Sequence, residues 1–346
     1  MAPPVGRPDR HLDWGRMDEL TLPIDLTTAR GTLNPEAVGY SRTPLHRTPL
    51  PGGPSSRLRT KRWEYWGVLT PDLALGMTLV NLGYAASLQI YVLDRATGQE
   101  ISLEPLKILP SAADIQLPDT LPPLTALGSA GDVSLRFHDD DGGTHLRARS
   151  PRVEVDLYAP AEGDVLGVVV PWSENRFQYT LKDVARSVAG TVTVDGKTFT
   201  VGEGAFAVLD RGRGRWPYRT TWTWGAGSGV VDGTRIGLQI GGQWTAGTPA
   251  TENALIVDGR LHHYDGELEF SYDLNDPAST WTVHGPWIDA VLTPFHRRKS
   301  ATKAVVISSE IWQAFGSWTG TARTPDGTSY SLDGLTGWIE EARHRW

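Results

Sequence analysis

The sequence contains no cysteine, only three methionines and no long apolar run. Without cysteine the chain can form neither disulfide bonds nor thiolate metal sites, and it cannot use a cysteine nucleophile. No apolar segment approaches the roughly 18 residues that a membrane-spanning helix needs. The N-terminal residues also lack the apolar core of a secretory signal. We therefore expect a cytoplasmic protein without a transmembrane segment.

Clustered positive charge is missing as well, because 33 Lys and Arg residues stand against 40 Asp and Glu residues, for a net charge of −7. Nucleic-acid binding usually requires a basic face, so no nucleic-acid partner is predicted. The 38 glycines and 24 prolines stay below the proportion of a low-complexity chain. The length of 346 residues suits two domains or one large β body, and leaves the oligomeric state open.

From residue 63 onward, apolar and polar residues alternate in short runs such as DVSLRFH and RVEVDLYA, which is typical of half-buried strands. The dipeptide Asp-Gly, which suits the type I′ hairpin turn, occurs seven times. It lies between alternating runs in TVTVDGKTFTV and ALIVDGRLHHY. Helical patterns are scarce, and we expect only a short C-terminal helix over residues 337–346. The fold class predicted is all-β, with antiparallel strands closed into two barrels that pack together.

Three regions are expected along the chain. Residues 1–60 hold nine prolines and no lysine with little periodicity, which indicates an extended N-terminal arm. The alternating texture then continues to the C-terminus, interrupted by a segment over residues 160–190 without clear alternation. We therefore predict a first β-barrel domain over residues 61–185 and a second over residues 186–346.

One acidic residue stands out as a candidate catalytic group. In the predicted strand AFAVLD, Asp210 shares a face with Phe206 and Val208. If that face is buried, the neutral form of the carboxyl is favoured and Asp210 could act as a general acid. The alternative is that one of the arginines that follow, Arg211, Arg213 or Arg215, pairs with Asp210 and holds it ionised.

Aromatic residues cluster just after this aspartate. Eleven of the 14 tryptophans lie at residue 172 or later, and Trp216, Tyr218, Trp222 and Trp224 share one parity along the chain. Two interpretations remain open. The rings could fill a core, or they could line a cavity for a flat or polyene-like ligand and stabilise a developing cation with their π faces.

Further polar residues interrupt apolar surroundings elsewhere in the second half. Each suits either a structural hydrogen bond or a contact to a ligand. Our predicted catalytic set is Asp210 with assistance from Glu252 and His296. No metal site and no cofactor are predicted. The predicted substrate-binding residues are Trp172, Glu174, Asn175, Arg176, Arg215, Trp216, Tyr218, Trp222, Trp224, Asn253 and Glu310.

Several segments resemble a known family. WEYWG, ENRFQYTLKDVARSVAGTVTVDG, LDRGRGRWPYRTTWTWGAGSG, GLQIGGQWTAGTPATENAL, TPFHRR and LTGWIEEA are similar to the actinobacterial family catalogued as domain of unknown function 2804. The similarity extends over nearly the whole chain. The family name implies no established activity.

A more distant resemblance concerns the order G-x-V-x-x-D-G, a strand, and then G-x-A-x-x-x-D. It is similar to the second domain of carotenoid 1,2-hydratases and of related lipocalin-like proteins, including tocopherol cyclase-like and Diels–Alderase proteins. This resemblance implies two lipocalin-like barrels, a large apolar ligand, and an alkene-protonating aspartate at Asp210. The hydratases continue with His-Asn-Trp-Gly, whereas this chain continues with Arg-Gly-Arg-Gly.

Three functions remain open on these grounds. The first is an enzyme that acts on a large terpenoid, polyene or polyketide-like substrate by acid-assisted cyclisation, hydration or isomerisation, or by pericyclic folding. The second is a carrier or sensor of an apolar small-molecule ligand without chemistry. The third is a structural protein whose tryptophans pack against one another.

Overall fold

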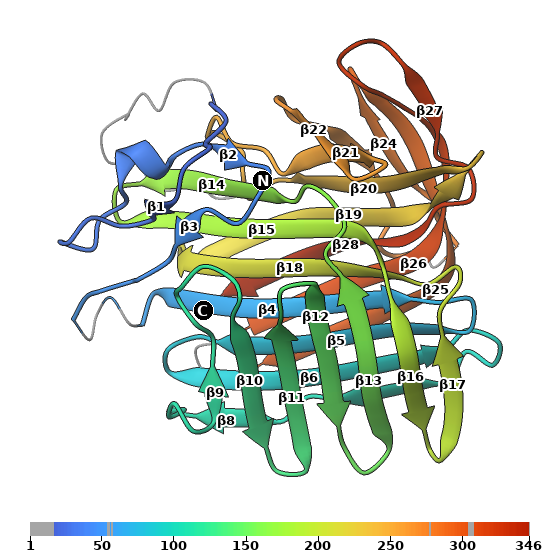
Figure 1. The fold of residues 1–346 in the computed structure, drawn as a ribbon, viewed down its shortest axis with the longest axis horizontal. Helices are drawn as coiled ribbons and strands as arrows, with labels where there is room; N and C mark the ends of the chain where they lie inside the picture. Colours follow the sequence, from blue (N-terminus) through green and yellow to red (C-terminus); the bar gives the residue numbers. More distant parts are fainter. Residues whose placement is uncertain (1–16, 54–55, 57, 277, 304–307, 346) are drawn as a thin grey trace.

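The computed structural model describes residues 17–346, apart from residues 54–55, 57, 277, 304–307 and 346. Three large antiparallel sheets dominate this part of the chain, and we call them the central, front and C-terminal sheets. Figure 1 shows the strands of the front sheet crossing those of the central sheet, while the C-terminal sheet lies on the other side of the central sheet. The fold is therefore layered, and the central sheet contributes to the cores on both of its sides.

The central sheet has nine strands, which come from the arm, from residues 60–187 and from one later segment. Strand β18, residues 206–215, comes last in the sequence among these strands. It nevertheless lies between the earlier strands β15 and β4. In spatial order the strands are β2 (Tyr40–Ser41), β14 (Leu166–Ser173), β15 (Arg176–Ser187), β18 (Phe206–Arg215), β4 (Thr60–Leu69), β5 (Leu73–Asn81), β6 (Ala85–Asp94) and β7 (Glu100–Leu103), with β8 (Leu106–Ile108) also paired to β6.

The front sheet has seven strands in nearly continuous chain order. Together with the central sheet it encloses the first apolar core, which includes Leu79, Leu146 and Leu157. In spatial order its strands are β17 (Lys197–Val201), β16 (Ala189–Val194), β13 (Val153–Pro160), β12 (Gly143–Arg149), β11 (Val133–Asp139), β10 (Thr125–Ala130) and β9 (Ile115–Gln116).

The C-terminal sheet has ten strands and curls around its own apolar core, which includes Leu238, Trp281 and Trp318. In spatial order its strands are β22 (Arg260–Tyr264), β21 (Asn253–Val257), β20 (Thr234–Gly242), β19 (Arg219–Val231), β28 (Thr336–Arg345), β26 (Ser308–Arg323), β25 (Ile288–Lys303), β24 (Trp281–Gly285) and β23 (Glu269–Ser271), with β27 (Ser329–Ser331) also paired to β26.

Where the structure describes the arm, between residues 17 and 59, it is mostly irregular and contains short elements only. Its strand β2 extends the edge of the central sheet by pairing with β14. Its other elements are β1 (Ile24–Asp25), the 3-10 turn η1 (Pro35–Ala37) and β3 (His46–Arg47), with β1 and β3 forming a small parallel pair.

Asp-Gly turns join neighbouring strands as the sequence predicts. In three hairpins, both turn residues have positive φ, the conformation that a type I′ turn requires. An aspartate tolerates this region better than most residues with a side chain, and glycine adopts it without steric cost. The φ values are 48° and 84° at Asp195-Gly196, 50° and 80° at Asp232-Gly233, and 47° and 80° at Asp258-Gly259.

The all-β prediction is confirmed, but the predicted C-terminal helix is wrong. Residues 336–345 form β28, which pairs with β19 on one side and β26 on the other. Its composition of Glu, Ala and Arg favours a helix locally. Two hydrogen-bonded neighbours and the burial of Trp338 and Ile339 override that preference.

The pairing of strands into sheets does not divide the chain at residue 186. The strands β16, β17 and β18 follow that residue, yet they join the front and central sheets. The C-terminal sheet begins with β19. The division into domains at residues 185 and 186 stays a prediction, while the three sheets are what positions the candidate site.

Candidate functional site

The apolar layer between the central and C-terminal sheets contains a group of buried charges, and we call it the junction layer. Its position follows from strand alternation along β18. Ala207 and Leu209 project into the first core, whereas Val208 packs in the junction layer. Asp210 has the parity of Val208 and is 9% exposed. The predicted alternation along this strand is therefore correct.

Asp210 accepts contacts on both carboxylate oxygens. The hydroxyl of Thr180 donates to Oδ1 over 3.1 Å, and the indole N–H of Trp63 donates to Oδ2 over 3.0 Å. The ammonium group of Lys182 lies 3.2 Å from Oδ1. These three contacts involve both oxygens of the Asp210 carboxylate.

The cation beside Asp210 differs from the one expected. The sequence suggested an arginine among Arg211, Arg213 and Arg215, but all three project from the opposite face of β18. Lys182 fills this place because β15 runs beside β18, with Lys182 directly opposite Asp210 in the register. Only the pairing of two strands distant in sequence brings the two together.

Lys182 also binds a second carboxylate, that of Glu252. Its ammonium nitrogen lies 3.2 Å from Glu252 Oε2 and 4.1 Å from the ring centroid of Trp224. The other oxygen, Oε1, accepts a hydrogen bond from the indole of Trp244 over 2.7 Å. Burial opposes the charge on Lys182, but the two carboxylates outweigh it and raise its pKa. Burial raises the pKa of Glu252, although Lys182 and Trp244 act in the opposite direction.

A third carboxyl of the junction layer, Glu340 on β28, is absent from the predicted set. The indole of Trp222 donates to Oε1 and the amide of Gln313 donates to Oε2, each over 3.0 Å. Burial raises the pKa of Glu340 to about 7. A strand over residues 336–345 would place Glu340 on the face of Trp338 and Ala342. The alternation along this segment would indicate the position of Glu340, but the composition of the segment favours a helix.

Tryptophans surround these groups and contact one another. The ring of Trp216 lies 4.8 Å from Trp172, 5.4 Å from Trp244, 5.5 Å from Trp63 and 6.0 Å from Trp222, measured between centroids. Four predicted binding residues therefore share the layer, namely Trp172, Trp216, Trp222 and Trp224. Trp63, Trp172 and Trp222 are half-buried and lie at its periphery.

A second aromatic group of the junction layer consists of Tyr65, Trp224 and Trp338. Tyr65 is the register partner of Asp210 on β4. Its ring packs edge-on against Trp224 and Trp338, at centroid distances of 5.7 and 5.9 Å. The three rings therefore pack edge to face against one another.

Two glycines make room for this arrangement. A Cβ on Gly212 would lie 2.2 Å from ring carbons of Trp63, and a Cβ on Gly241 would lie 2.0 Å from Oε1 of Glu252. Glycine within a strand often marks such close approach of a neighbouring group. The alternation of arginine and glycine in RGRGR therefore keeps one face of β18 open for the indole that binds Asp210.

The remaining predicted residues lie elsewhere. His296 contacts Glu100 of β7, four strands away from β18 in the central sheet. Arg215 donates to backbone carbonyls of Gly31 and Pro51 in the arm. Five more predicted residues also lie outside the charged group of the junction layer. Glu174 and Asn175 are exposed in the β14–β15 turn, and Arg176 donates to the carbonyl of Asn175. Tyr218 is 43% exposed beside Arg59, and Asn253 binds the backbone of Gly241 and Gly266.

Glu310 is likewise separate from this group. It lies on β26 as the register partner of Arg343 and is half-buried. Gln313, three positions further, has the opposite parity and reaches Glu340. Glu310 and Gln313 therefore lie on opposite faces of β26.

Comparison with known proteins agrees with this architecture. By structure the chain is similar to an AttH-type protein from Nitrosomonas europaea, with a TM-score of 0.52 and 14% identity over 82% of this chain and 92% of that one. It is also similar to kievitone hydratase from Nectria haematococca, with a TM-score of 0.52 and 10% identity over 94% and 98% of the two chains. The fold is that of the two-barrel lipocalin-like proteins, as predicted.

The chain belongs to the family described as domain of unknown function (DUF2804), whose model matches residues 17–346. This confirms the resemblance noted in the sequence. No curated protein matches the chain. Among the residues that the structure describes, no helix is long and apolar enough to span a membrane.

Proposed function

We propose that the junction layer is the active site of an enzyme that transfers a proton to an unsaturated, largely apolar small molecule. The observation that carries this proposal is Glu340, a buried carboxyl with a pKa of about 7 among aromatic rings. A general acid works best when its pKa lies near the working pH. Trp222 and Gln313 are neutral donors, so they fix the carboxyl without adding a positive charge beside it.

Glu340 takes the role that the sequence suggested for Asp210. The two carboxyls differ in their surroundings, because Asp210 has the ammonium of Lys182 at 3.2 Å and Glu340 is held by uncharged groups. Two carboxyls whose environments differ in this way are suited to different tasks. Glu340 donates the proton, and Asp210 with Lys182 and Glu252 provides a fixed charged wall.

The proposed reaction conserves atoms and electrons without an external oxidant. Glu340 in its acid form donates its proton to one carbon of a C=C bond, which leaves a carbocation on the other. In a hydration, water adds to the cation and then loses a proton. In a cyclisation, a second C=C bond attacks the cation, and the new cation formed loses a proton from a neighbouring C–H bond. In an isomerisation, a C–H bond next to the first cation loses its proton. The proton released in each case returns to the Glu340 carboxylate.

Aromatic rings and the charged wall stabilise the cation in this scheme. Tyr65, Trp224 and Trp338 lie in the same layer as the two carboxyls, and a π face attracts a cation. Lys182, Asp210 and Glu252 together carry one net negative charge when ionised, which favours positive charge nearby. The reaction class is also in keeping with the name of kievitone hydratase, which has a similar fold.

The decisive experiment is deuterium incorporation in D2O. The purified protein is incubated with a panel of terpenoid, polyene and polyketide-like alkenes, and products are analysed by mass spectrometry. Proton transfer places one deuterium on carbon in the product. Glu340→Gln should abolish incorporation, whereas Glu341→Gln should retain it, because Glu341 faces away from the layer and binds Tyr272 and Arg343.

Two outcomes would contradict the assignment of Glu340. One is turnover at the parental rate in Glu340→Gln, which would indicate either another acid or a pericyclic reaction that needs no acid. The other is loss of turnover in Asp210→Asn but not in Glu340→Gln, which would return the acid role to Asp210.

A second candidate function is that of a non-catalytic carrier of an apolar ligand. It is favoured by one observation, the mutual pairing of Lys182, Asp210 and Glu252, which satisfies these charges without a ligand. A carrier would release an apolar molecule in native mass spectrometry and leave it chemically unchanged on incubation in D2O. An enzyme would convert it.

A further inference from the structure

Two arginines lie directly opposite each other at one end of the C-terminal sheet. Arg219 begins β19 and Arg345 ends β28, and the register pairs them across the two antiparallel strands. Side chains at such positions share one face of the sheet, with Cβ atoms about 4.5–5.5 Å apart. Arg219 is exposed and Arg345 is half-buried, so solvent reaches the pair. Like charges directly opposite each other destabilise a strand pair, so this arrangement has an energetic cost.

Within the part of the chain that the structure describes, no carboxylate offsets this repulsion. Neither guanidinium forms an ion pair or a hydrogen bond there, and the buried Nε of Arg345 has no partner. Glu341 has the same parity as Arg345 along β28, but its carboxylate accepts contacts from Arg343 and Tyr272. The two positive charges therefore stand side by side without a counter-charge from these residues.

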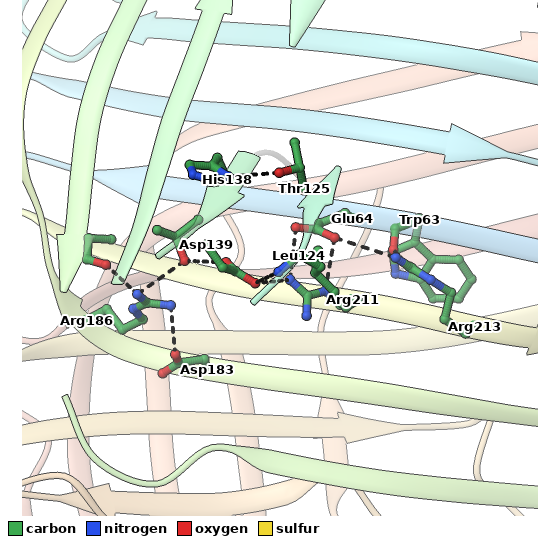
Figure 2. Close-up of polar contacts among 12 residues, drawn as sticks. Trp63, Glu64, Leu124, Thr125, His138, Asp139, Asp183, Arg186, Arg211 and Arg213 are labelled. Atoms are coloured by element: carbon green, nitrogen blue, oxygen red, sulfur yellow. Dashed lines mark hydrogen bonds and ion pairs between the residues drawn. The ribbon is translucent and has the colours of Figure 1, made fainter. Parts of the chain in front are cut away.

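Two buried arginines elsewhere in the chain have carboxylate partners of their own. Arg211 binds Glu64 through two parallel contacts, at 3.0 and 3.2 Å, and Arg186 lies 3.2 Å from Asp183 (Figure 2). The first is the bidentate arrangement in which a guanidinium holds a carboxylate most firmly. In both cases the counter-charge comes from the chain itself.

The front sheet contains a matched case of two opposed arginines. Arg136 and Arg147 lie directly opposite each other on β11 and β12. Asp156 is the next residue of the same row, on β13, and accepts a hydrogen bond from Arg147 over 3.1 Å. A row with two arginines is thus balanced by a carboxylate in the front sheet, whereas the row at the end of β19 and β28 is not.

Neighbouring side chains on the same face increase the positive charge at this end of the sheet. Ser308 on β26 is the other register partner of Arg345 and is half-buried. Arg343 and Lys299 lie over the ring of Trp312, at 4.9 and 4.6 Å from its centroid. The side chains described on this face in the last three rows are four cations and two carboxylates, an excess of two positive charges: Arg219, Arg343, Arg345 and Lys299 against Glu310 and Glu341.

We propose that Arg219, Arg345 and Ser308 bind the phosphate group of a small phosphate monoester. A phosphate carries nearly two negative charges at pH 7 and three strong acceptor oxygens, which match two unpaired guanidiniums and one hydroxyl. A carboxylate carries a single charge, and the two parallel donors of one arginine satisfy it. The fourth phosphate oxygen faces solvent and carries the organic part of the ligand. Because the site lies at the surface, it needs no internal cavity.

This phosphate site is separate from the proposed active site. His344, the residue before Arg345, stacks on Trp222 of the junction layer with ring centroids 4.3 Å apart. Successive side chains of a strand point to opposite faces, so Arg345 lies on the face away from the junction layer. Phosphate binding and proton transfer by Glu340 can therefore be tested, and can fail, independently of each other.

The test measures binding of inorganic phosphate, methyl phosphate and nitrate to the full chain by isothermal titration, at constant low ionic strength and about pH 8, where phosphate is a dianion. Phosphate and methyl phosphate should bind with similar affinity. Nitrate, a monoanion, should bind at least about tenfold more weakly. Arg219→Met should weaken phosphate about tenfold, the loss expected for one charge-assisted hydrogen bond. Raising the ionic strength should weaken phosphate further, because these charges are exposed and screened by salt.

The matched control is Arg136→Met, which also removes one exposed arginine from an opposed pair and should bind phosphate like the parent. Melting temperatures give a second readout. Without phosphate, Arg219→Met should melt no lower than the parent, because one of two like charges is gone. Phosphate should raise the melting temperature of the parent more than that of Arg219→Met.

Three outcomes would overturn the proposal. The first is absence of phosphate binding to the parent. The second is equal phosphate affinity in the parent and Arg219→Met, or an equal loss in Arg219→Met and Arg136→Met, which would indicate attraction by overall charge only. The third is nitrate binding as tight as phosphate binding, because the site would then not select a dianion.

Discussion

Lys182 and Asp210 face each other across β15 and β18, with the ammonium nitrogen 3.2 Å from a carboxylate oxygen and both side chains almost entirely buried. Buried ion pairs recover their desolvation cost only when the geometry is good, and losing one partner leaves an uncompensated charge. Lys182 serves two carboxylates, because Glu252 is at the same distance. It is therefore the member of the group whose loss should matter most.

We expect Lys182→Met to lower the free energy of unfolding by about 3–5 kcal/mol, the range for breaking a buried pair. The triple variant Lys182→Met, Asp210→Asn, Glu252→Gln removes all three charges and should recover most of that loss. Urea denaturation measures both. If Lys182→Met is as stable as the parent, the three charges are not coupled as the distances indicate.

Between pH 4.5 and about 7, Glu340 should contribute a loss of stability as the pH rises. Its pKa is about 7 in the folded chain, raised by burial from 4.5. Between these values the folded protein holds a proton that the unfolded chain has lost, so rising pH favours unfolding. The melting temperature of Glu340→Gln should decrease less steeply over this range than that of the parent.

Other buried groups also change the stability of the fold with pH. The quantity to compare is therefore the difference in melting temperature between the parent and Glu340→Gln at each pH. Asp183, with its pKa raised by burial to about 6, has the same sign as Glu340. His46 and His344 have pKa values lowered by burial to about 4 and about 3, so they destabilise the fold as the pH falls below 6.5. Parallel curves for the parent and Glu340→Gln would contradict the raised pKa.

Gly212→Ala should disturb the hydrogen bond that Trp63 donates to Asp210. The added Cβ would lie 2.2 Å from the indole and 2.4 Å from the amide nitrogen of Gln178. Overpacking of this kind typically costs about 1–3 kcal/mol. Gly202→Ala is the control, because its Cβ has nothing within 4 Å. Equal unfolding free energies for the two variants would show that the indole is not confined as described.

Arg215→Met should loosen the arm from the central sheet. The guanidinium donates to the carbonyls of Gly31 and Pro51, and hydrogen bonds to charged groups contribute about 1.5–3 kcal/mol each. Limited proteolysis with mass spectrometry should then detect faster cleavage between residues 17 and 53. Arg219→Met, an exposed position on β19, should be cleaved like the parent. Unchanged cleavage in Arg215→Met would mean that other contacts hold the arm.

Much of the candidate site was accessible from the sequence because it depends on local patterns. Alternation along residues 205–210 predicted which face of the strand carries Asp210, and the excess of late tryptophans indicated the region of the aromatic layer. Lys182 and Glu340 were missed for different reasons. Lys182 lies on a strand that was not recognised, and Glu340 lies in a segment whose composition favours a helix.

The sequence by itself determined the strand-rich class, the Asp-Gly hairpins and the faces of individual strands, because these depend on backbone preferences over a few residues. Only the tertiary structure decided that β18 enters the central sheet between β15 and β4. That insertion selects Lys182 rather than an arginine as the partner of Asp210, and it places Arg211 and Arg213 beside Glu64 on the opposite face of the sheet. Pairing between distant strands depends on the packing of whole sheets, so no short segment of the chain encodes it.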